Sequence, residues 1–500
     1  MMPAHSARPA WRLGDLLAGL ADPGPVPERQ VSGLTLDSRT VGPGSLFLAC
    51  QGRRAHGLAF AEEAARRGAS AILAETSPDW PAPTLGLVRA RTGIPVLGVP
   101  ELATLTSALA DRFYGEPSAH LEVLGVIGTQ GRTRAGHLLA QALDAERPCG
   151  LVGGLGTGFT SDLKGGAPHP ADPITLQATL AGLRGQGAAA VALELSPSRF
   201  RGPLTGSVRL GQALITGLAG ESLDPATLSA LPWAVINRDD PLQIRLLDGL
   251  ESRVRIATYG LGPNSGPPPR CDLWVHARTV QAQPGGLRIR VASSLGDGLL
   301  TTGLIGYRHA GALLAVLAAL LGRGLPLEVA LQRLAGLRGV PGRMESVGGD
   351  GAPLVVVDHA HSPDALEKAL TDLRLHGGRR VIAVVGCRGD RDRGERPLLG
   401  AIAERLSDAL ILTDDNPGGE DGDAILADIL GGLSRPDAVR VERQRGLAIR
   451  LAIALAGTGD AVLVAGKGQE NTQDLGELKV HFSDRAQVVE ALREWREGHH

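Results

Sequence analysis

A short segment, Gly128-Thr-Gln-Gly131-Arg132-Thr133, places glycines, a cation and a hydroxyl between the apolar run LEVLGVIG and the helix-like run AGHLLAQALD. A glycine-rich turn of this kind lets backbone N–H groups face a phosphate, with the Thr133 hydroxyl available for Mg²⁺. Arg132 stands where a P-loop carries lysine, and it keeps the charge in a wider, planar group. Two interpretations stay open at this point: a P-loop-like phosphate site, or an ordinary glycine-rich turn.

Three further loops carry charged side chains directly after apolar runs. They cover residues 358–364, 386–394 and 415–417. Because the carboxyl ends of parallel strands meet at one edge of a sheet, we expect these loops to lie together. Taken singly, Asp358 is compatible with a helix cap and Arg391 with a solvated surface charge. As a set, the loops favour ligand binding.

The order of elements predicts an α/β protein of three consecutive α/β domains. Strand and helix patterns alternate along most of the chain, which is typical of parallel sheets covered by helices. A breaker cluster at 115–117 and a glycine-rich connector around 338–343 place the domains at 1–119, 120–337 and 338–500. We expect a central P-loop-like parallel sheet and a C-terminal, Rossmann-like doubly wound domain.

Composition excludes several classes of protein. A chain of 500 residues with 43% hydrophobic and 21% charged residues is globular and longer than one ordinary domain. A net charge of −2 argues against a nucleic-acid partner. The apolar run 310–322 is too short to span a bilayer and predicts a buried helix, so no membrane insertion is expected. Four scattered cysteines favour free thiols, and with them a cytoplasmic location.

Lysine is rare in this sequence. Only Lys164, Lys368, Lys467 and Lys479 occur, and all other basic side chains except histidine are arginine. We interpret this bias as drift from lysine to arginine wherever a generic positive charge suffices. A retained lysine is therefore informative, and Lys467 lies in the glycine-rich segment AGKGQE.

A series of motifs, in order along nearly the whole chain, resembles the Mur ligase family, and within it the tripeptide synthetases that add the third residue of the peptidoglycan stem peptide. The motifs are LDSR at 36–39, the glycine-rich loop at 128–133, NRDDP at 237–241, GVPGRME at 339–345, VVDHAHSPDALEKAL at 356–370, GCRGDRDRGERP at 386–397, TDDNP at 413–417 and AGKGQE at 465–470. The resemblance implies ATP-dependent amide formation, with ATP and Mg²⁺ as cofactors. It also implies UDP-N-acetylmuramoyl-dipeptide and an amino acid as partners in the reaction.

The resemblance also implies roles for individual residues. The implied catalytic residues are Arg132, Thr133 and Glu194, of which Thr133 and Glu194 are also the implied metal ligands. The implied ATP-binding residues are Gly128, Thr129, Gly131, Arg132, Thr133, Asn237, Asp240, Arg343 and Asp358. The implied UDP-sugar-binding residues are Ser38, Arg39 and Ser196, and the implied amino-acid-binding residues are Arg391, Asp415, Asn416, Gly466 and Glu470.

The central region departs from the family pattern at several positions. Arg132 replaces the loop lysine, Ser222 stands at a metal-site histidine, and the segment that carries a carbamylated lysine is missing after Asp224. The paired threonines of the family fall at His169 and Pro170. Losing several cations and ligands in one site costs many orders of magnitude in rate.

Three hypotheses about function remain open. The first is an active or residually active tripeptide synthetase. The second is a catalytically silent paralogue that binds the precursor or an intact Mur ligase. The third keeps ligase chemistry with another substrate. Gly418 replaces an arginine that pairs with the distal carboxylate of diaminopimelate in the family, so the sequence favours lysine or ornithine as the amine.

Overall fold

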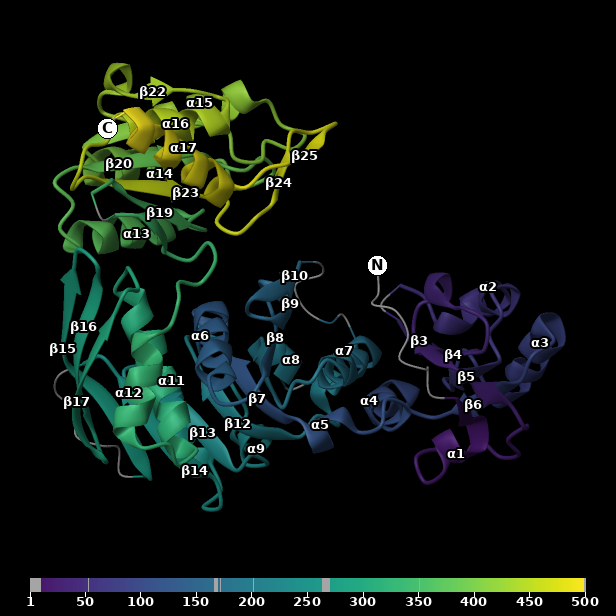
Figure 1. Cartoon of the computed structure of the whole chain (residues 1–500). Helices are drawn as coiled ribbons and strands as arrows, with labels where there is room; N and C mark the ends of the chain where they lie inside the picture. The colour runs from purple at the N-terminus through teal and green to yellow at the C-terminus, as the bar shows by residue number, and fades with distance from the viewer. Residues whose placement is uncertain are drawn as a thin grey trace. The chain divides into compact units, whose positions relative to one another are not determined.

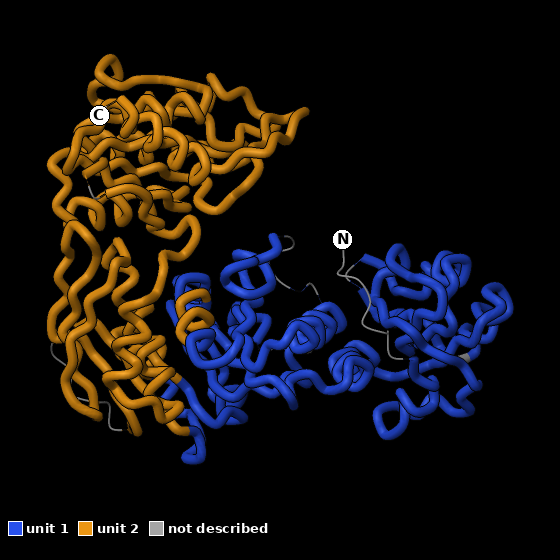
Figure 2. Tube along the Cα trace, in the orientation of Figure 1, with its two compact units in different colours: residues 1–136, 143–234, 245–254 blue, residues 137–142, 235–244, 255–500 orange. Residues whose placement is uncertain are grey.

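The computed structural model describes residues 10–52, 54–165, 170, 172–200, 202–262, 270–349 and 351–498. The chain divides into two compact units, which Figure 2 shows in different colours. The first consists of residues 1–136, 143–234 and 245–254, and the second of residues 137–142, 235–244 and 255–500. His169 lies outside the described residues.

The N-terminal part of the first unit is a four-stranded parallel sheet (Figure 1). Its strands, in order, are β3 (Gly33–Thr35), β4 (Ser45–Ala49), β5 (Ala71–Glu75) and β6 (Val96–Val99). Alternate residues of β4 enter two cores, because successive side chains of a strand point to opposite faces. Helices α1 (Leu13–Leu17) and α4 (Leu102–Phe113) contribute to one core, and α2 (Ala61–Arg66) and α3 (Ala82–Thr92) to the other.

The sheet that carries the glycine-rich loop has the order β10-β9-β8-β11-β7-β12 within the first unit. Its parallel strands are β7 (Glu122–Ile127), β8 (Cys149–Gly153), β11 (Ala190–Leu195) and β12 (Leu210–Ile215); its antiparallel strands are β9 (Gly156–Phe159) and β10 (Asp162–Lys164). The associated helices are α5 (Pro117–His120), α6 (Arg132–Asp144), α7 (Pro173–Gly185), α8 (Pro197–Phe200) and α9 (Pro225–Leu228). β7 lies between β11 and β12, so the loop that follows it is flanked by two strand ends.

A second group of strands runs in the order β13-β14-β15-β16-β17. They are β13 (Trp233–Asn237), β14 (Arg255–Gly260), β15 (Leu273–Gln283), β16 (Gly286–Ser293) and β17 (Gly296–Thr302), with helices α10 (Pro241–Gly249), α11 (Arg308–Gly322) and α12 (Leu327–Ala335). The apolar face of α11 is buried over nearly its whole length, as the sequence predicts for residues 310–322. Among the described residues, no helix is long and apolar enough to cross a membrane.

The C-terminal sheet has the order β18-β19-β23-β20-β21-β22, and all of its strands except β18 run parallel. The strands are β18 (Glu345–Gly348), β19 (Leu354–Asp358), β20 (Val381–Val385), β21 (Ala409–Leu412), β22 (Arg440–Val441) and β23 (Ala461–Ala465). Helices α13 (Pro363–Leu375), α14 (Glu395–Leu406) and α15 (Gly422–Leu430) cover one face, and α16 (Arg445–Ala454) and α17 (Asp484–Gly498) cover the other. The doubly wound C-terminal domain and the α/β fold class are confirmed.

The four cysteines are free thiols, in agreement with their spacing in the sequence. The domain boundaries proposed from the sequence remain a prediction.

A buried ion pair joins α16 to α17 in the second unit. Arg445 Nε and Nη2 donate to the two carboxylate oxygens of Asp484 at 2.7 and 2.8 Å, and both side chains are fully buried. Removing one member of such a pair leaves an uncompensated charge in the interior, which is far more costly than losing a solvated pair.

We therefore expect Arg445→Leu to lower the free energy of unfolding by about 3–5 kcal/mol. Arg450→Leu on the same helix is the matched control, since Arg450 pairs with Glu490 at the surface and its loss costs at most about 1 kcal/mol. Urea denaturation of both variants measures the difference. Equal losses in the two variants would contradict this account of the buried pair.

Candidate functional site

The glycine-rich loop leaves three N–H groups at the start of α6. The N–H groups of Thr129 and Gln130 donate to the Gly217 carbonyl at 2.9 Å, which fixes the loop against the end of β12. No residue that the structure describes accepts a hydrogen bond from the N–H of Gly131, Arg132 or Thr133. Gly131 adopts φ +81°, a left-handed conformation that glycine tolerates best. These groups and the helix dipole favour an anion at this end of α6.

Arg132, Thr133 and Glu194 lie together beside this loop. The Thr133 hydroxyl donates to Glu194 Oε2 at 2.9 Å, and Arg132 Nε lies 3.8 Å from the same oxygen. Arg132 Nη1 also donates to the Gly128 carbonyl at 2.7 Å. The guanidinium thus bends back over the loop and partly neutralises the buried carboxylate of Glu194.

This donor set fits a Mg²⁺ ion that arrives with a nucleotide. Mg²⁺ is usually held by one or two carboxylates together with substrate phosphates and water, and Thr133 and Glu194 supply a hydroxyl and a carboxylate. The described residues contain no group of three or more His, Cys, Asp or Glu side chains that could hold a metal ion by themselves. Ser222, at the position of a family metal ligand, is exposed.

The remaining residues implied for ATP are held in turns of the second unit. Asn237 Oδ1 accepts the N–H of Asp239 at 3.0 Å, and Asp240 Oδ1 accepts the N–H of Leu242 at 2.9 Å, which shapes the turn between β13 and α10. Arg343 Nη1 donates to Gln469 Oε1 at 2.6 Å. Asp358, buried at the end of β19, accepts the N–H of Met344 at 2.7 Å. Arg343 is thus the last residue of the connector predicted at 338–343, and Asp358 contacts the residue that follows it.

The residues implied for the UDP-sugar have mixed surroundings in the first unit. The Ser38 hydroxyl is buried and donates to Glu63 at 2.7 Å, whereas Arg39 is 78% exposed and pairs with Asp37 at 2.7 Å. Ser196 follows β11, and its oxygen lies 3.0 Å from that of Ser198. Of these residues, Arg39 and Ser196 are the more accessible.

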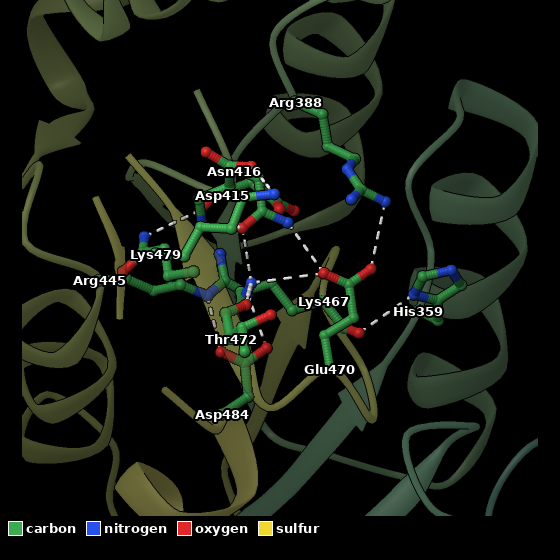
Figure 3. Close-up of polar contacts among 12 residues, drawn as sticks. His359, Arg388, Asp415, Asn416, Arg445, Lys467, Glu470, Thr472, Lys479 and Asp484 are labelled. Atoms are coloured by element: carbon green, nitrogen blue, oxygen red, sulfur yellow. Dashed lines mark hydrogen bonds and ion pairs between the residues drawn. The ribbon is translucent and has the colours of Figure 1, made fainter. Parts of the chain in front are cut away.

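A dense polar cluster forms where β21 and β23 end (Figure 3). The buried ammonium of Lys467 donates to Asn416 Oδ1 at 2.9 Å and to the Thr472 carbonyl at 2.7 Å, and lies 3.4 Å from Glu470 Oε2. Asn416 Nδ2 donates to the same Glu470 oxygen at 2.8 Å. Arg388 Nη1 donates to the other oxygen, Oε1, at 3.1 Å. The cluster brings Asn416 and Glu470 together, as expected for loops at one sheet edge.

The charges of this cluster shift the pKa values of its members. Burial alone raises the pKa of Glu470, but the charge of Arg388 and the hydrogen bond from Asn416 outweigh it and hold the pKa below its ordinary value. Burial lowers the pKa of Lys467 despite the nearby carboxylates of Asp415 and Glu470.

Asp415 is the member of the cluster whose hydrogen-bonding capacity is unused. It is 1% exposed, and neither carboxylate oxygen has a hydrogen-bond partner within the part of the chain that the structure describes. Burial raises its pKa, which the positive charge of Arg445 opposes. A Cβ atom on Gly466 would stand 2.2 Å from Asp415 Oδ2, so only glycine fits against this carboxylate. A buried carboxylate without a donor fits an incoming ammonium group.

The structure places Arg388, and not the predicted Arg391, in contact with the cluster. Arg391 is exposed, and no hydrogen bond or ion pair joins it to the cluster among the described residues. Arg388, three positions earlier in the same loop, contacts Glu470 directly. The sequence analysis missed Arg388, although its position in GCRGDRDRGERP was a sufficient signal to consider it.

Comparisons with known proteins agree with the fold and with the order of these loops. The model of the Mur ligase family, catalytic domain, matches residues 30–114, and that of the Mur ligase, glutamate ligase domain, matches residues 342–468. The UDP-N-acetylmuramoyl-L-alanyl-D-glutamate–2,6-diaminopimelate ligase of Alkalilimnicola ehrlichii is 41% identical, over 97% of this chain and 99% of its own. The ligase of the same name from Pseudomonas aeruginosa is 42% identical over 93% of this chain and 96% of its own.

A solved structure of a UDP-N-acetylmuramoyl-L-alanyl-D-glutamate–2,6-diaminopimelate ligase has the same fold. It superimposes with a TM-score of 0.69 at 27% identity, and the match covers 97% of this chain and 99% of the other. The fold and the sequence together define a three-domain α/β ligase scaffold. The chain belongs to the Mur ligase family.

The position of Arg132 generates a first test. We expect Arg132→Ala to weaken the binding of a non-hydrolysable ATP analogue about 10- to 100-fold, since one charge-assisted contact is worth about 1.5–3 kcal/mol. Arg132→Lys should retain most of the affinity because it keeps the charge. Isothermal titration calorimetry measures both, with Arg184→Ala, an exposed arginine of α7, as the control. Unchanged affinity in Arg132→Ala would assign the loop a structural role.

The pKa of His359 generates a second test. Burial, reinforced by the charge of Arg343, lowers it from 6.5 to about 4. The unfolded chain therefore binds more protons between these pH values, and the free energy of unfolding falls as the pH drops from 6.5 towards 4. His359→Asn should flatten this dependence without changing it above pH 7. Denaturant titrations from pH 4.5 to 7.5 measure the free energy of unfolding of both proteins. If this free energy changes with pH equally in both, the dependence does not come from His359.

Proposed function

We propose that this protein is an ATP-dependent ligase that joins an amino acid to UDP-N-acetylmuramoyl-L-alanyl-D-glutamate, with 2,6-diaminopimelate as the amine. The observation that carries the proposal is 41% identity, over nearly the full length, to ligases named for this reaction. The phosphate loop and the amine-binding cluster described above are compatible with it.

The proposed chemistry has two steps. The substrate carboxylate attacks the terminal phosphorus of ATP, releasing ADP and forming an acyl phosphate. The amine then attacks the acyl carbon, and inorganic phosphate leaves as the amide forms. Positioned cations supply most of the catalysis in phosphoryl transfer, because the reaction develops little new covalent character for the protein to stabilise.

Residues of this chain are proposed to contact the phosphates, the metal ion and the rest of the nucleotide. The N–H groups of Gly131 and Thr133, with the guanidinium of Arg132, hold the phosphates and offset their charge. Gly128 and Thr129 shape the loop. Thr133 and Glu194 would hold Mg²⁺, which supplies charge neutralisation when bound with the nucleotide. The further nucleotide contacts are assigned to Asn237, Asp240, Arg343 and Asp358.

The two substrates are assigned to separate residue sets. Ser38, Arg39 and Ser196 are proposed to contact the UDP-sugar. Asp415 and Glu470 are proposed to attract the ammonium groups of the amine, with Asn416 and Gly466 shaping the pocket and Arg391 at its exposed edge. An unpaired buried carboxylate such as Asp415 is stabilised when a cation enters, which favours amine binding.

Turnover of the full chain tests the proposal. We expect the purified protein, with UDP-N-acetylmuramoyl-L-alanyl-D-glutamate, ATP, Mg²⁺ and 2,6-diaminopimelate, to form one UDP-linked tripeptide for each ADP released. Mass spectrometry and an ADP assay measure the two products. Glu194→Gln should reduce the rate at least about 100-fold, since it removes the carboxylate charge beside the proposed metal.

Lysine and ornithine, offered in place of diaminopimelate, extend the same assay to the other amines that Gly418 suggests. Binding of the UDP-linked precursor without ADP release for any of the three amines would instead support a silent paralogue.

A further inference from the structure

Arg388 stands at the rim of the amine-binding cluster with most of its hydrogen-bonding capacity unused. Its side chain is 36% exposed, and Nη1 donates to Glu470 Oε1 at 3.1 Å. Among the described residues, Glu470 alone accepts a hydrogen bond from it. A guanidinium has five N–H donors in a fixed planar fork, so several remain for a ligand.

Glu470 is held in place independently of Arg388. Asn416 Nδ2 and Lys467 Nζ contact its other carboxylate oxygen at 2.8 and 3.4 Å. Loss of Arg388 therefore leaves two contacts that keep the Glu470 carboxylate in the pocket. An effect of Arg388 on binding can thus be separated from an effect on the shape of the cluster.

The loop of Arg388 packs directly on the loop of Asn416. The Gly389 N–H donates to the Asn416 carbonyl at 2.9 Å, and a Cβ atom on Gly389 would stand 1.9 Å from the Pro417 carbonyl oxygen. The segment 415–419 itself contains no basic residue. At Gly418 the backbone has φ +59°, which disfavours any larger side chain there. Besides the fully buried Lys467, which is already committed to Asn416 and Glu470, the neighbouring loop brings a partly exposed cation, Arg388, to this side of the cluster.

The charged side chains of the cluster are complementary to an ammonium and a carboxylate carried on the same carbon of a substrate. Asp415 and Glu470 present carboxylates to an ammonium, and Arg388 presents a fork to a carboxylate, in which two parallel N–H···O bonds can form. Lysine and ornithine end in an ammonium alone and leave this fork without a carboxylate. A substrate whose distal end carries both an ammonium and a carboxylate gives a partner to Asp415 and Glu470 and to Arg388.

We propose that Arg388 is the specificity-determining residue of this cluster, and that it selects a diamino acid with a second carboxylate over lysine and ornithine. This inference rests on the proposed ligase function. It revises the expectation drawn from Gly418, because the missing charge is supplied by a different loop. An arginine paired at the surface adds little to folding stability, so the contact with Glu470 does not by itself give Arg388 a structural role.

Steady-state kinetics with two amines test the proposal. In Arg388→Gln, we expect kcat/KM for 2,6-diaminopimelate to fall about 10- to 100-fold, mainly through KM, while kcat/KM for lysine stays within about threefold. Arg388→Lys keeps the charge but not the planar fork, so its kcat/KM for diaminopimelate should lie between those of the unaltered chain and Arg388→Gln. Arg393→Gln is the matched control, because Arg393 lies in the same loop and pairs with Asp428 instead.

Calorimetric titration of the full chain with 2,6-diaminopimelate alone provides a readout that needs no turnover. Weaker binding in Arg388→Gln than in Arg393→Gln supports the proposal even if the protein forms no product, in which case only the proposed function fails. Equal losses for diaminopimelate and lysine would show a structural role for Arg388 and overturn the proposal while leaving the ligase function intact. Undetectable binding of diaminopimelate to the unaltered chain, together with turnover of lysine, would also overturn it.

Discussion

The C-terminal site depends on the burial of one ammonium group. An ion taken out of water must regain its hydration energy from hydrogen bonds and opposite charges, or it loses its proton. Lys467 does so by joining Asn416, Glu470 and the Thr472 carbonyl, which belong to different loops. The same ammonium therefore fixes the loop after β21 against the loop after β23. The slim stem and three N–H donors of Lys467 match the three partners of this fully buried position, which is where one of the four lysines of the chain is found.

Much of the fold could be predicted because parallel strands have a strong local signature. The runs at 354–357, 381–385 and 461–465 are apolar throughout; Asp358 follows the first, and glycine follows each of the other two. The same rule predicted that the loops at 386–394 and 415–417 lie together, which the hydrogen bond from the Gly389 N–H to the Asn416 carbonyl confirms; Glu470 was expected at the site only from the family resemblance. The rule could not rank Arg388 above Arg391, because both lie in one charged loop and only the path of that loop decides which one reaches Glu470. The link from Arg445 to Asp484, 39 positions apart, likewise depends on tertiary packing.

The phosphate loop illustrates how a substitution changes geometry while preserving charge. The guanidinium of Arg132 reaches the Gly128 carbonyl and approaches Glu194, so its positive charge remains beside the N–H groups of α6. A lysine side chain offers a point charge with three donors, whereas arginine spreads its charge over a plane and holds fixed directions. Arginine at this position therefore preserves the electrostatic attraction for phosphate but changes the geometry of the contact between the cation and the phosphate.

Gly418 and Ser222 both depart from the family pattern, but within the described residues a neighbouring side chain replaces the lost one only at Gly418. Gly418 lies against the loop that carries Arg388, because both loops leave adjacent strands at the same sheet edge, so a cation remains in the pocket. Ser222 is exposed, and the described residues hold no group of three or more His, Cys, Asp or Glu side chains that could bind a metal ion. In the proposed reaction, charge neutralisation is therefore assigned to Arg132, the N–H groups of α6 and the cation that Thr133 and Glu194 would hold. A site of this kind binds its cation through the substrate's phosphates, so the affinity for Mg²⁺ and the affinity for the nucleotide are linked and rise together.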